Sequence, residues 1–206
     1  HDLLFMVTFT YTGYSLVRYL AQYIQDGQIG EIRTIMAEFP QQSQAVPRVA
    51  GKKVNWRNDI TQNGGTNCLG DIGVHIMALA HMMTGLKTQK VLEQMEMLAP
   101  DSQLDDNDYV MVKYDNGASG MYWASKIVLG NGNGLKIRIY GSKGAVTWEQ
   151  EDAEKAYITD EMGHTRLIKR GEKGMASGYD RLPNGHPEDL YEAMGNLYVS
   201  FVKCLK

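Results

Sequence analysis

The sequence of 206 residues has few cysteines and lacks any long apolar run. Its two cysteines, Cys68 and Cys204, have no CxxC spacing and are too few for a disulfide framework. Reduced thiols in a cytoplasmic protein are the expected state. The longest apolar runs fall far short of the ~20 residues that a membrane-spanning helix needs, and the sequence contains no secretory signal pattern. We therefore expect a cytoplasmic protein with no membrane partner.

The chain also lacks a strong excess of charge. It carries 21 basic and 24 acidic residues, for a net charge of −3, and the basic residues are scattered. This distribution gives no electrostatic footprint for nucleic acid. The composition is 43% hydrophobic and 22% charged, close to that of an average globular domain. A hydrophobic core of ordinary size is therefore expected.

An initiator methionine is also absent. The chain opens on His1-Asp2 and passes at once into residues 3–10, LLFMVTFT, whose apolar run predicts a buried strand. A natural protein rarely begins inside a strand without a tail. We therefore expect this chain to be part of a longer protein, cut at or near a domain boundary.

The hydrophobic pattern predicts helices and strands in a segregated order. Helical patterns occur at residues 14–26, 64–85 and 186–206, and strand patterns at residues 30–40, 90–98, 108–126, 135–150 and 156–170. Residues 41–63 are polar and irregular, and residues 171–185 are loop. The order predicts an α+β fold, in which a large, mostly antiparallel sheet has helices packed on one face.

Turn and capping residues refine this prediction. Asp115-Asn116-Gly117 and Ser142-Lys143-Gly144 lie between alternating runs and predict two hairpins. Pro187 suits the first turn of the last helix. The apolar stripe of that helix is predicted to consist of Leu190, Met194, Leu197, Phe201 and Leu205. The GNGNG stretch at 130–134 lies between two strands, so it is a loop and not a dinucleotide-binding fingerprint.

One largely apolar segment carries an aspartate and a histidine four residues apart. Residues 64–85 read GGTNCLGDIGVHIMALAHMMTG, and a helix would place Asp71 and His75 on one face. A carboxylate buried alone is strongly unfavourable, so the two residues must pair or face a polar cavity. Gly70 and Gly73 flank Asp71 and weaken a helix, which indicates that a ligand or another chain segment approaches the backbone there.

Three interpretations of this pair stay open on the residues alone. The first is a structural pair at a helix end. The second is an acid/base pair in which Asp71 orients His75 and tunes its pKa, because histidine exchanges a proton near neutral pH. The third is a metal site completed by His186 or Asp105. No further ligand lies at a diagnostic spacing, so we expect no metal, and Asp105-Asp106 is interpreted as a turn before a strand.

The same segment resembles the GGG-x-x-x-DIG-x-H helix of the Gfo/Idh/MocA family, the relatives of glucose–fructose oxidoreductase and inositol dehydrogenase. Other stretches are similar to further parts of that family: YTGYSLVRYLAQYIQDGQIGEIRTI to the handover between its two domains, NWRNDITQNGG to its W-R-x-D approach, DDNDYVMVKYDNGASGMYWAS and RIYGSKGAVTWEQE to its sheet strands, and RLPNGHPEDLYEAMGNLY to the closing helix of one subgroup. The resemblance extends over nearly the whole chain.

The resemblance implies a C-terminal domain. Family enzymes begin with a Rossmann domain that binds NAD or NADP and carries a catalytic lysine in a Glu-Lys-Pro motif; both are missing from this chain. Residues 1–206 would form the substrate-binding and oligomerisation domain, with residues 1–13 as the crossover strand from the missing domain. Asp71 and His75 would lie beside the nicotinamide. His75 would exchange the hydroxyl proton during hydride transfer, while Asp71 would hold the substrate or orient His75.

Further residues are candidate substrate ligands. Arg57, beside Trp56, has the forked donors that clamp a carboxylate or a sugar hydroxyl, and its alternative is a loop salt bridge. Asn131 and Asn133 are candidates to line a polyol pocket, and their alternative is plain turn chemistry. His186 is a candidate substrate ligand or a cap of the last helix. The family often has asparagine where this chain has Thr10, so the resemblance assigns Thr10 no role.

These inferences predict the substrate-binding and catalytic half of an NAD(P)-dependent oxidoreductase. The expected substrate is a sugar, a polyol or a related hydroxyl compound. The chain alone is expected to be inactive, because hydride transfer needs the cofactor domain. One face of the sheet is expected to be the interface between the subunits of a homo-oligomer. The alternative is a non-catalytic binding or scaffold module that has kept the same fold.

Overall fold

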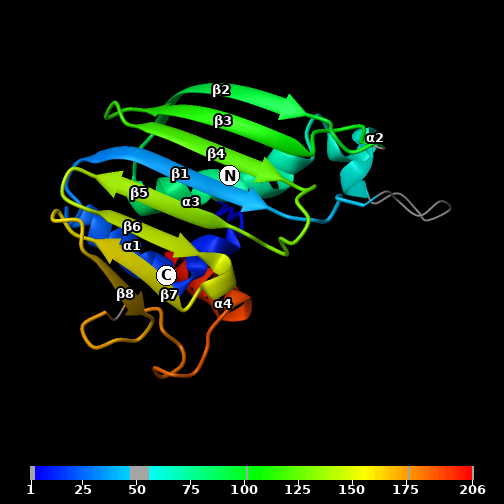
Figure 1. The fold of residues 1–206 in the computed structure, drawn as a ribbon. Coiled ribbons are helices and arrows are strands. Elements are labelled where there is room, and N and C mark those ends of the chain that lie inside the picture. Colours follow the sequence, from blue (N-terminus) through cyan, green and yellow to red (C-terminus); the bar gives the residue numbers. More distant parts are fainter. Residues whose placement is uncertain (1–2, 47–55, 101, 176, 206) are drawn as a thin grey trace.

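The computed structural model describes residues 3–46, 56–100, 102–175 and 177–205. Figure 1 shows one large, twisted sheet with the helices α1, α3 and α4 behind it. The α+β fold with helices on one face, predicted from the sequence, is confirmed. Among the described residues, no helix combines the length and the apolar character needed to cross a membrane.

The sheet has eight strands in the order β2-β3-β4-β1-β5-β6-β7-β8. Their bounds are β1 Ile32–Pro40, β2 Thr88–Glu96, β3 Asn107–Tyr114, β4 Ser119–Ser125, β5 Lys136–Gly141, β6 Ala145–Glu149, β7 Lys155–Thr159 and β8 Thr165–Lys169. β1 pairs in parallel with β4, and every other pairing in this sheet is antiparallel. The first strand in the chain therefore lies at the centre of the sheet, between β4 and β5 (Figure 1).

The helical elements are mostly short. They are η1 Thr10–Gly13, α1 Ser15–Gln25, η2 Trp56–Asn58, α2 Ile60–Asn63, η3 Leu69–Gly73, α3 Val74–Thr84, η4 Gln150–Asp152 and α4 Leu190–Cys204. The turns η2 and α2 fall in the segment 41–63 that was predicted to be irregular. Residues 47–55 of that segment lie outside the described residues.

Alternation along the strands separates a buried face from an open face. In β3, Val110 and Val112 are buried, whereas Tyr109 and Met111 are 44% and 58% exposed. The buried side chains meet the apolar faces of α1 and α3, which contribute Leu16, Leu20, Ile76 and Leu79 among others. Successive side chains of a strand point to opposite faces, so the core fills only the side of the sheet that the helices cover.

The second predicted hairpin packs backbone against backbone. In the β5–β6 turn, the amide of Lys143 donates to the carbonyl of Ile29 at 2.8 Å, and the amide of Ser142 donates to Glu31 at 2.9 Å. A Cβ atom at Gly141 would lie 2.0 Å from the carbonyl oxygen of Ile29. Glycine is therefore required there because the chain after α1 approaches too closely for a side chain. Both predicted hairpins, β3–β4 and β5–β6, are confirmed.

Residues 3–10 do not form the strand that their apolar run predicts. Residues 3–9 have no helical or strand structure, and Thr10 begins the 3-10 turn η1. A strand requires a neighbour for its backbone hydrogen bonds, and no strand of the described chain pairs with this segment. Leu3 and Phe5 are 83% and 89% exposed. The strand prediction is wrong here, and the crossover role of residues 1–13 stays a prediction.

The last helix begins later than predicted, and its inward face matches the predicted stripe only at Leu197, with Met194 and Phe201 partly buried. α4 starts at Leu190 after the N-cap Asp189, so Pro187 precedes the helix. Its buried residues are Ala193, Asn196 and Leu197, whereas Leu190 and Leu205 of the predicted stripe are 38% and 61% exposed. The helix packs through small and polar groups: a Cβ atom at Gly13 would lie 2.1 Å from the carbonyl oxygen of Ala193, and Asn196 donates to the Gly13 carbonyl at 3.0 Å.

Candidate active site

Asp71 lies in a π-helical turn, at the point where a regular helix was predicted. The turn η3 leads directly into α3, which ends at Gly85 in the left-handed conformation with φ 69°. π turns are rare and often occur at functional sites. In this turn the carboxylate of Asp71 forms ion pairs with Arg57 in η2 and with Lys126 just after β4.

Two cations hold the Asp71 carboxylate. The ammonium group of Lys126, just after β4, donates to Oδ2 at 2.8 Å, and the guanidinium of Arg57 in η2 donates to Oδ1 at 3.2 Å. Burial disfavours the charged carboxylate, but the hydrogen bond and charge of Lys126, followed by those of Arg57, outweigh burial and hold the pKa of Asp71 below its usual value. Asp71 is therefore ionised at neutral pH.

Lys126 is a buried lysine, which is unusual among soluble proteins. Its side chain is only 3% exposed. Besides Asp71, the ammonium group donates to Oδ1 of Asn67 at 2.7 Å. Oδ1 of Asn58 in turn accepts from the Asn67 amide at 2.9 Å. The lysine thus joins the end of β4 to the start of the helical segment and fixes Asp71 between them.

A polar pocket opens beside this group. Arg57, Asp71 and Lys126 line a pocket of about 230 Å³ together with Gln41, Ser43, Gln44 and Asn58. The amide and hydroxyl groups can each donate and accept hydrogen bonds, and the charged groups add fixed donors and one acceptor. This lining is suited to a small molecule with several hydroxyl groups.

His75 faces aromatic rings. Its ring centroid lies 5.0 Å from that of Tyr11, 5.9 Å from that of Phe9 and 6.4 Å from that of Phe39, all in edge-on geometry. Its Nδ1 atom is buried and has no hydrogen-bond partner among the described residues. Burial lowers the pKa of His75 below its usual value, and the charge of Asp71 partly opposes that shift. Burial therefore favours the neutral imidazole, and no described residue fixes which ring nitrogen carries the proton.

Asn133 is connected to both His75 and the pocket. Its amide donates to the hydroxyl of Tyr11 at 3.1 Å, and its Oδ1 accepts from Gln41 at 2.9 Å. Tyr11 packs on His75, and Gln41 lines the pocket. Asn131, by contrast, lines a different pocket together with Glu38, Glu149 and other residues. The structure thus brings one of the two loop asparagines to the candidate site.

Of the remaining predicted ligands, Trp56 contacts the pocket residue Arg57, whereas His186 lies away from the pocket. Trp56 is 50% exposed and stacks under the guanidinium of Arg57, at 4.6 Å from ring centroid to Cζ. His186 is exposed, and its carbonyl oxygen accepts from the buried guanidinium of Arg170 at 2.5 Å. The predicted capping role of His186 is wrong, because Asp189 is the N-cap residue of α4. The structure places His186 with the loop before α4 and not with the pocket.

The close approach predicted at the two glycines comes from the chain itself. A Cβ atom at Gly73 would lie 2.6 Å from Cδ1 of Leu69, and one at Gly70 would lie 3.0 Å from Cγ2 of Thr66. The hydroxyl of Thr10 also has a local partner, because it donates to the Thr8 carbonyl at 3.5 Å.

The Asp105-Asp106 turn is confirmed: Asp106 accepts from the amides of Leu98 and Ala99, and β3 follows.

Sequence reasoning missed Lys126, Asn67, Gln41 and Tyr11. A lysine after a strand usually extends into solvent, and no local pattern distinguishes a buried one. The polar residues of the pocket come from segments far apart in the chain, and only the tertiary fold brings them together. The apolar character of residues 3–11 was a usable signal for Phe9 and Tyr11, although they lie in a loop and a 3-10 turn.

Comparison with known proteins agrees with this architecture. A family model described as "GFO/IDH/MocA C-terminal domain" matches residues 17–147. The uncharacterized oxidoreductase YfiI of Bacillus subtilis is 30% identical, over 95% of this chain and 51% of the relative. The chain spans about half the length of the curated relatives that it matches.

Two crystal structures from Azotobacter vinelandii are similar in fold and sequence. An inositol dehydrogenase homolog complexed with NAD+ is 31% identical with a TM-score of 0.88, covering 95% of this chain and 52% of that one. An inositol dehydrogenase homolog complexed with NADH and myo-inositol is 30% identical with a TM-score of 0.84, covering 95% of this chain and 51% of that one.

The electrostatic link between Asp71 and His75 can be measured. Asp71→Asn removes the negative charge that opposes the effect of burial, so we expect the pKa of His75 to fall further. An NMR titration of the imidazole Cε1–H resonance gives this value. Asp160→Asn, in the β7–β8 turn, is the matched control and should leave the His75 titration unchanged. If the pKa of His75 is the same in Asp71→Asn as in the wild type, the two groups are not coupled.

Proposed function

The chain belongs to the GFO/IDH/MocA family and matches the C-terminal domain of its members. From this we propose that it is the substrate-binding and catalytic half of an NAD(P)-dependent oxidoreductase. The reaction is hydride removal from, or return to, the CH–OH carbon of a sugar, a polyol or a related compound. Residues 1–206 form the substrate-binding and oligomerisation domain, and residues 1–13 connect it to a preceding dinucleotide-binding domain.

His75 is the proposed proton acceptor and donor. The observation that carries this role is a buried ring nitrogen without a hydrogen-bond partner, on a histidine whose pKa lies below its usual value. As the carbinol carbon becomes a carbonyl, the substrate hydroxyl must lose a proton, and a neutral imidazole can take it. In reduction the imidazolium returns that proton. The rings of Phe9 and Tyr11 lie edge-on to the imidazole.

Asp71, Arg57 and Lys126 are proposed to position the substrate. The carboxylate accepts hydrogen bonds from substrate hydroxyls while the two cations keep it ionised. Lys126 acts through Asp71 and Asn67 and is a positioning residue. Trp56 supports Arg57 by stacking, and Asn133 supports His75 through Tyr11. Asn131 and His186 have no part in this proposal.

The family implies a nicotinamide dinucleotide, and two similar structures contain NAD+ or NADH. The unpaired nitrogen of His75 and the rings around it fit the substrate side of such a group. When bound, the nicotinamide exchanges the hydride. The described residues contain no glycine-rich turn between a strand and a helix for its phosphates. We therefore propose that NAD or NADP binds mainly to the preceding domain, so this chain alone is inactive.

His75→Gln tests the catalytic role in the full-length protein. We expect kcat for oxidation of the preferred polyol to fall by ~100- to 10,000-fold, the usual contribution of a general base, with dinucleotide affinity and unfolding temperature unchanged. Initial rates with NAD+ and NADP+ against a panel of sugars and polyols, beginning with myo-inositol, give kcat and KM.

His164→Gln is the control, because that imidazole is 81% exposed in the β7–β8 turn. It should keep the wild-type kcat. In the wild-type protein, kcat/KM for oxidation should decline toward acid as His75 takes up a proton, with the midpoint below the usual histidine pKa. Wild-type turnover in His75→Gln would favour the alternative, a binding or scaffold module that has kept the fold.

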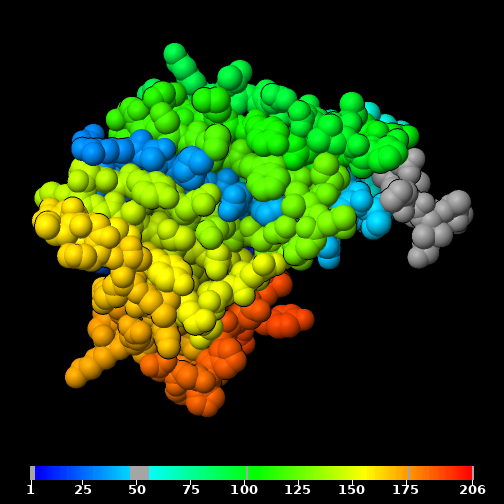
Figure 2. All heavy atoms as spheres, in the orientation of Figure 1, coloured from blue at the N-terminus to red at the C-terminus, as the bar shows by residue number. Residues whose placement is uncertain are grey.

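The open face of the sheet is proposed as the contact between copies of the chain. Met111 and Met121 face each other across β3 and β4, and Met36 of β1 pairs with Met121 from the other side. Met111 and Met121 are 58% and 47% exposed. Figure 2 shows that strands form the centre of this surface, with no helix across it. Exposed apolar patches of this kind often mark protein interfaces.

Met111→Asp combined with Met121→Asp should reduce the oligomer to a monomer, because two charges would be buried without partners. Light scattering coupled to size exclusion measures the mass. Met162→Asp, at an exposed turn position, is the matched control and should leave the oligomer intact. A wild-type protein that is monomeric at the same concentration would contradict the proposed interface.

A cytoplasmic location is proposed on the state of the cysteines. Cys68 and Cys204 are both free, the first buried and the second exposed. Free thiols are typical of reducing compartments. Fractionation of the native cells tests the location, and recovery of the protein outside the cytoplasm would contradict it.

A further inference from the structure

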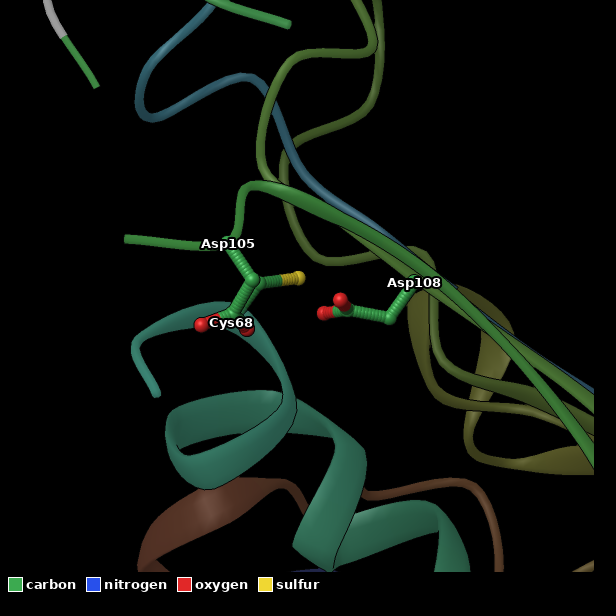
Figure 3. Close-up of side chains that lie close together, drawn as sticks. All are labelled: Cys68, Asp105 and Asp108. Atoms are coloured by element: carbon green, nitrogen blue, oxygen red, sulfur yellow. The ribbon is translucent and has the colours of Figure 1, made fainter. Parts of the chain in front are cut away.

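Three potential metal ligands meet in the interior beside the candidate site. Ligand atoms of Cys68, Asp105 and Asp108 lie within 4.8 Å of one another, and all three residues are buried. Figure 3 shows the thiol of Cys68 and the carboxylate of Asp108 pointing toward each other from the start of the helical segment and from β3. We propose that these residues bind a divalent, thiophilic metal ion of the chemical class of Zn²⁺.

The environment of the Asp108 side chain is the observation that points to a ligand. The residue is 0% exposed, and neither carboxylate oxygen has a hydrogen-bond partner among the described residues. Buried polar groups are almost always satisfied, and an isolated buried carboxylate is strongly unfavourable. Its oxygens are directed into the cluster (Figure 3). A cation between Asp108 and its two neighbours would satisfy both oxygens.

Asp105 has capacity for one more partner. Its Oδ2 accepts from the Thr66 hydroxyl at 2.9 Å and from the Leu69 amide at 2.8 Å, and its Oδ1 accepts from the Asn67 amide at 2.6 Å. A carboxylate offers about four lone-pair sites. These three bonds orient the group rigidly and leave one site on Oδ1, as is common for a carboxylate whose position is set before it binds a metal.

The donor set selects the class of metal. Magnesium and calcium prefer oxygen ligands alone, whereas thiolate selects zinc and related soft or borderline ions. Zinc binds cysteine, histidine and carboxylate ligands in tetrahedral sites. Cys68, Asp105 and Asp108 supply three ligands, and a water molecule would take the fourth position, as in zinc sites with three protein ligands.

The charges around the cluster balance a divalent ion. With a thiolate, the three ligands carry three negative charges, of which the metal neutralises two. The adjacent group of Lys126, Arg57 and Asp71 has two cations and one anion, and its surplus positive charge offsets the third. The closest link is Asn67, which bonds to Lys126 through its side chain and to Asp105 through its backbone amide.

The sequence predicted no metal site, and the reason is topological. Cys68 has no cysteine at a CxxC spacing, and its partners lie in a loop and strand that follow α3 and β2. The fold brings the ligands together where the amide of Cys68, just before η3, donates to the carbonyl of Asp105, just before β3, at 3.1 Å. A bound ion would clamp the segment that carries Asp71 to the sheet, and its binding does not depend on the proposed oxidoreductase activity.

Cobalt titration of the metal-free full-length protein tests this site. Co²⁺ replaces zinc in such sites, and a thiolate ligand gives it an intense charge-transfer absorption. We expect that band to reach its maximum at one Co²⁺ per chain and to be displaced by Zn²⁺. The variants are Cys68→Ser and Asp108→Asn, and Cys204→Ser is the matched control because that thiol is exposed.

The band should be lost in Cys68→Ser and strongly weakened in Asp108→Asn, with Cys204→Ser like wild type. Zinc should raise the unfolding temperature of the wild type and not of Asp108→Asn, and circular dichroism confirms that the variants are folded. Two results would overturn the proposal. One is a wild-type protein that binds no Co²⁺ or Zn²⁺, which would mean that Asp105 and Asp108 share only a proton. The other is a charge-transfer band that persists in Cys68→Ser.

Discussion

The buried ammonium group of Lys126 determines where the candidate active site forms. It is held at the end of β4, in the part of the sheet where β1 and β4 run in parallel, and it bonds to both Asn67 and Asp71. A buried charge requires a partner of opposite sign, so the segment 67–71 must lie against this strand end. The π turn places Asp71 there, and α3 then carries His75 toward Phe9 and Tyr11.

The chemistry follows from two opposite electrostatic environments within one turn of chain. Asp71 is kept charged by Lys126 and Arg57 despite partial burial, whereas His75 is kept neutral by burial among aromatic rings. Pairs of titratable groups whose surroundings separate their protonation states are typical of acid/base sites. The charged group is suited to bind hydroxyls, and the neutral group is suited to accept a proton. This difference between Asp71 and His75 favours the proposed acid/base role over the interpretation of the two residues as a structural pair.

The sequence predicted the sheet and the helices well because alternation and helical periodicity are local signals. β3, β4 and the Asp115–Gly117 hairpin follow directly from pattern. The predictions for residues 3–10 and for the two ends of the α4 stripe were wrong because the packing depends on distant groups. Gly13 and Asn196 determine how α4 docks, and an apolar stripe does not show this. For the candidate site, motif and spacing pointed to Asp71, His75 and Arg57, and the structure brings Asp71 and Arg57 together. Lys126 and Gln41 were not predicted, and neither was the environment of Asp108 in the neighbouring cluster, because a buried polar residue is recognisable only by the partners that the fold supplies.

The most direct test of this account is a double-mutant cycle between Lys126→Met and Asp71→Asn, measured by chemical denaturation of the full-length protein. Lys136→Met, which removes a half-exposed surface ion pair with Glu149, is the reference for an ordinary lysine. The account predicts that Lys126→Met costs about 2 kcal/mol, because the carboxylate of Asp71 and the amide oxygen of Asn67 lose a buried donor. It also predicts a coupling energy with Asp71→Asn above about 1 kcal/mol. Additivity within about 0.5 kcal/mol would contradict it, because Lys126 would then not be what holds Asp71 in place.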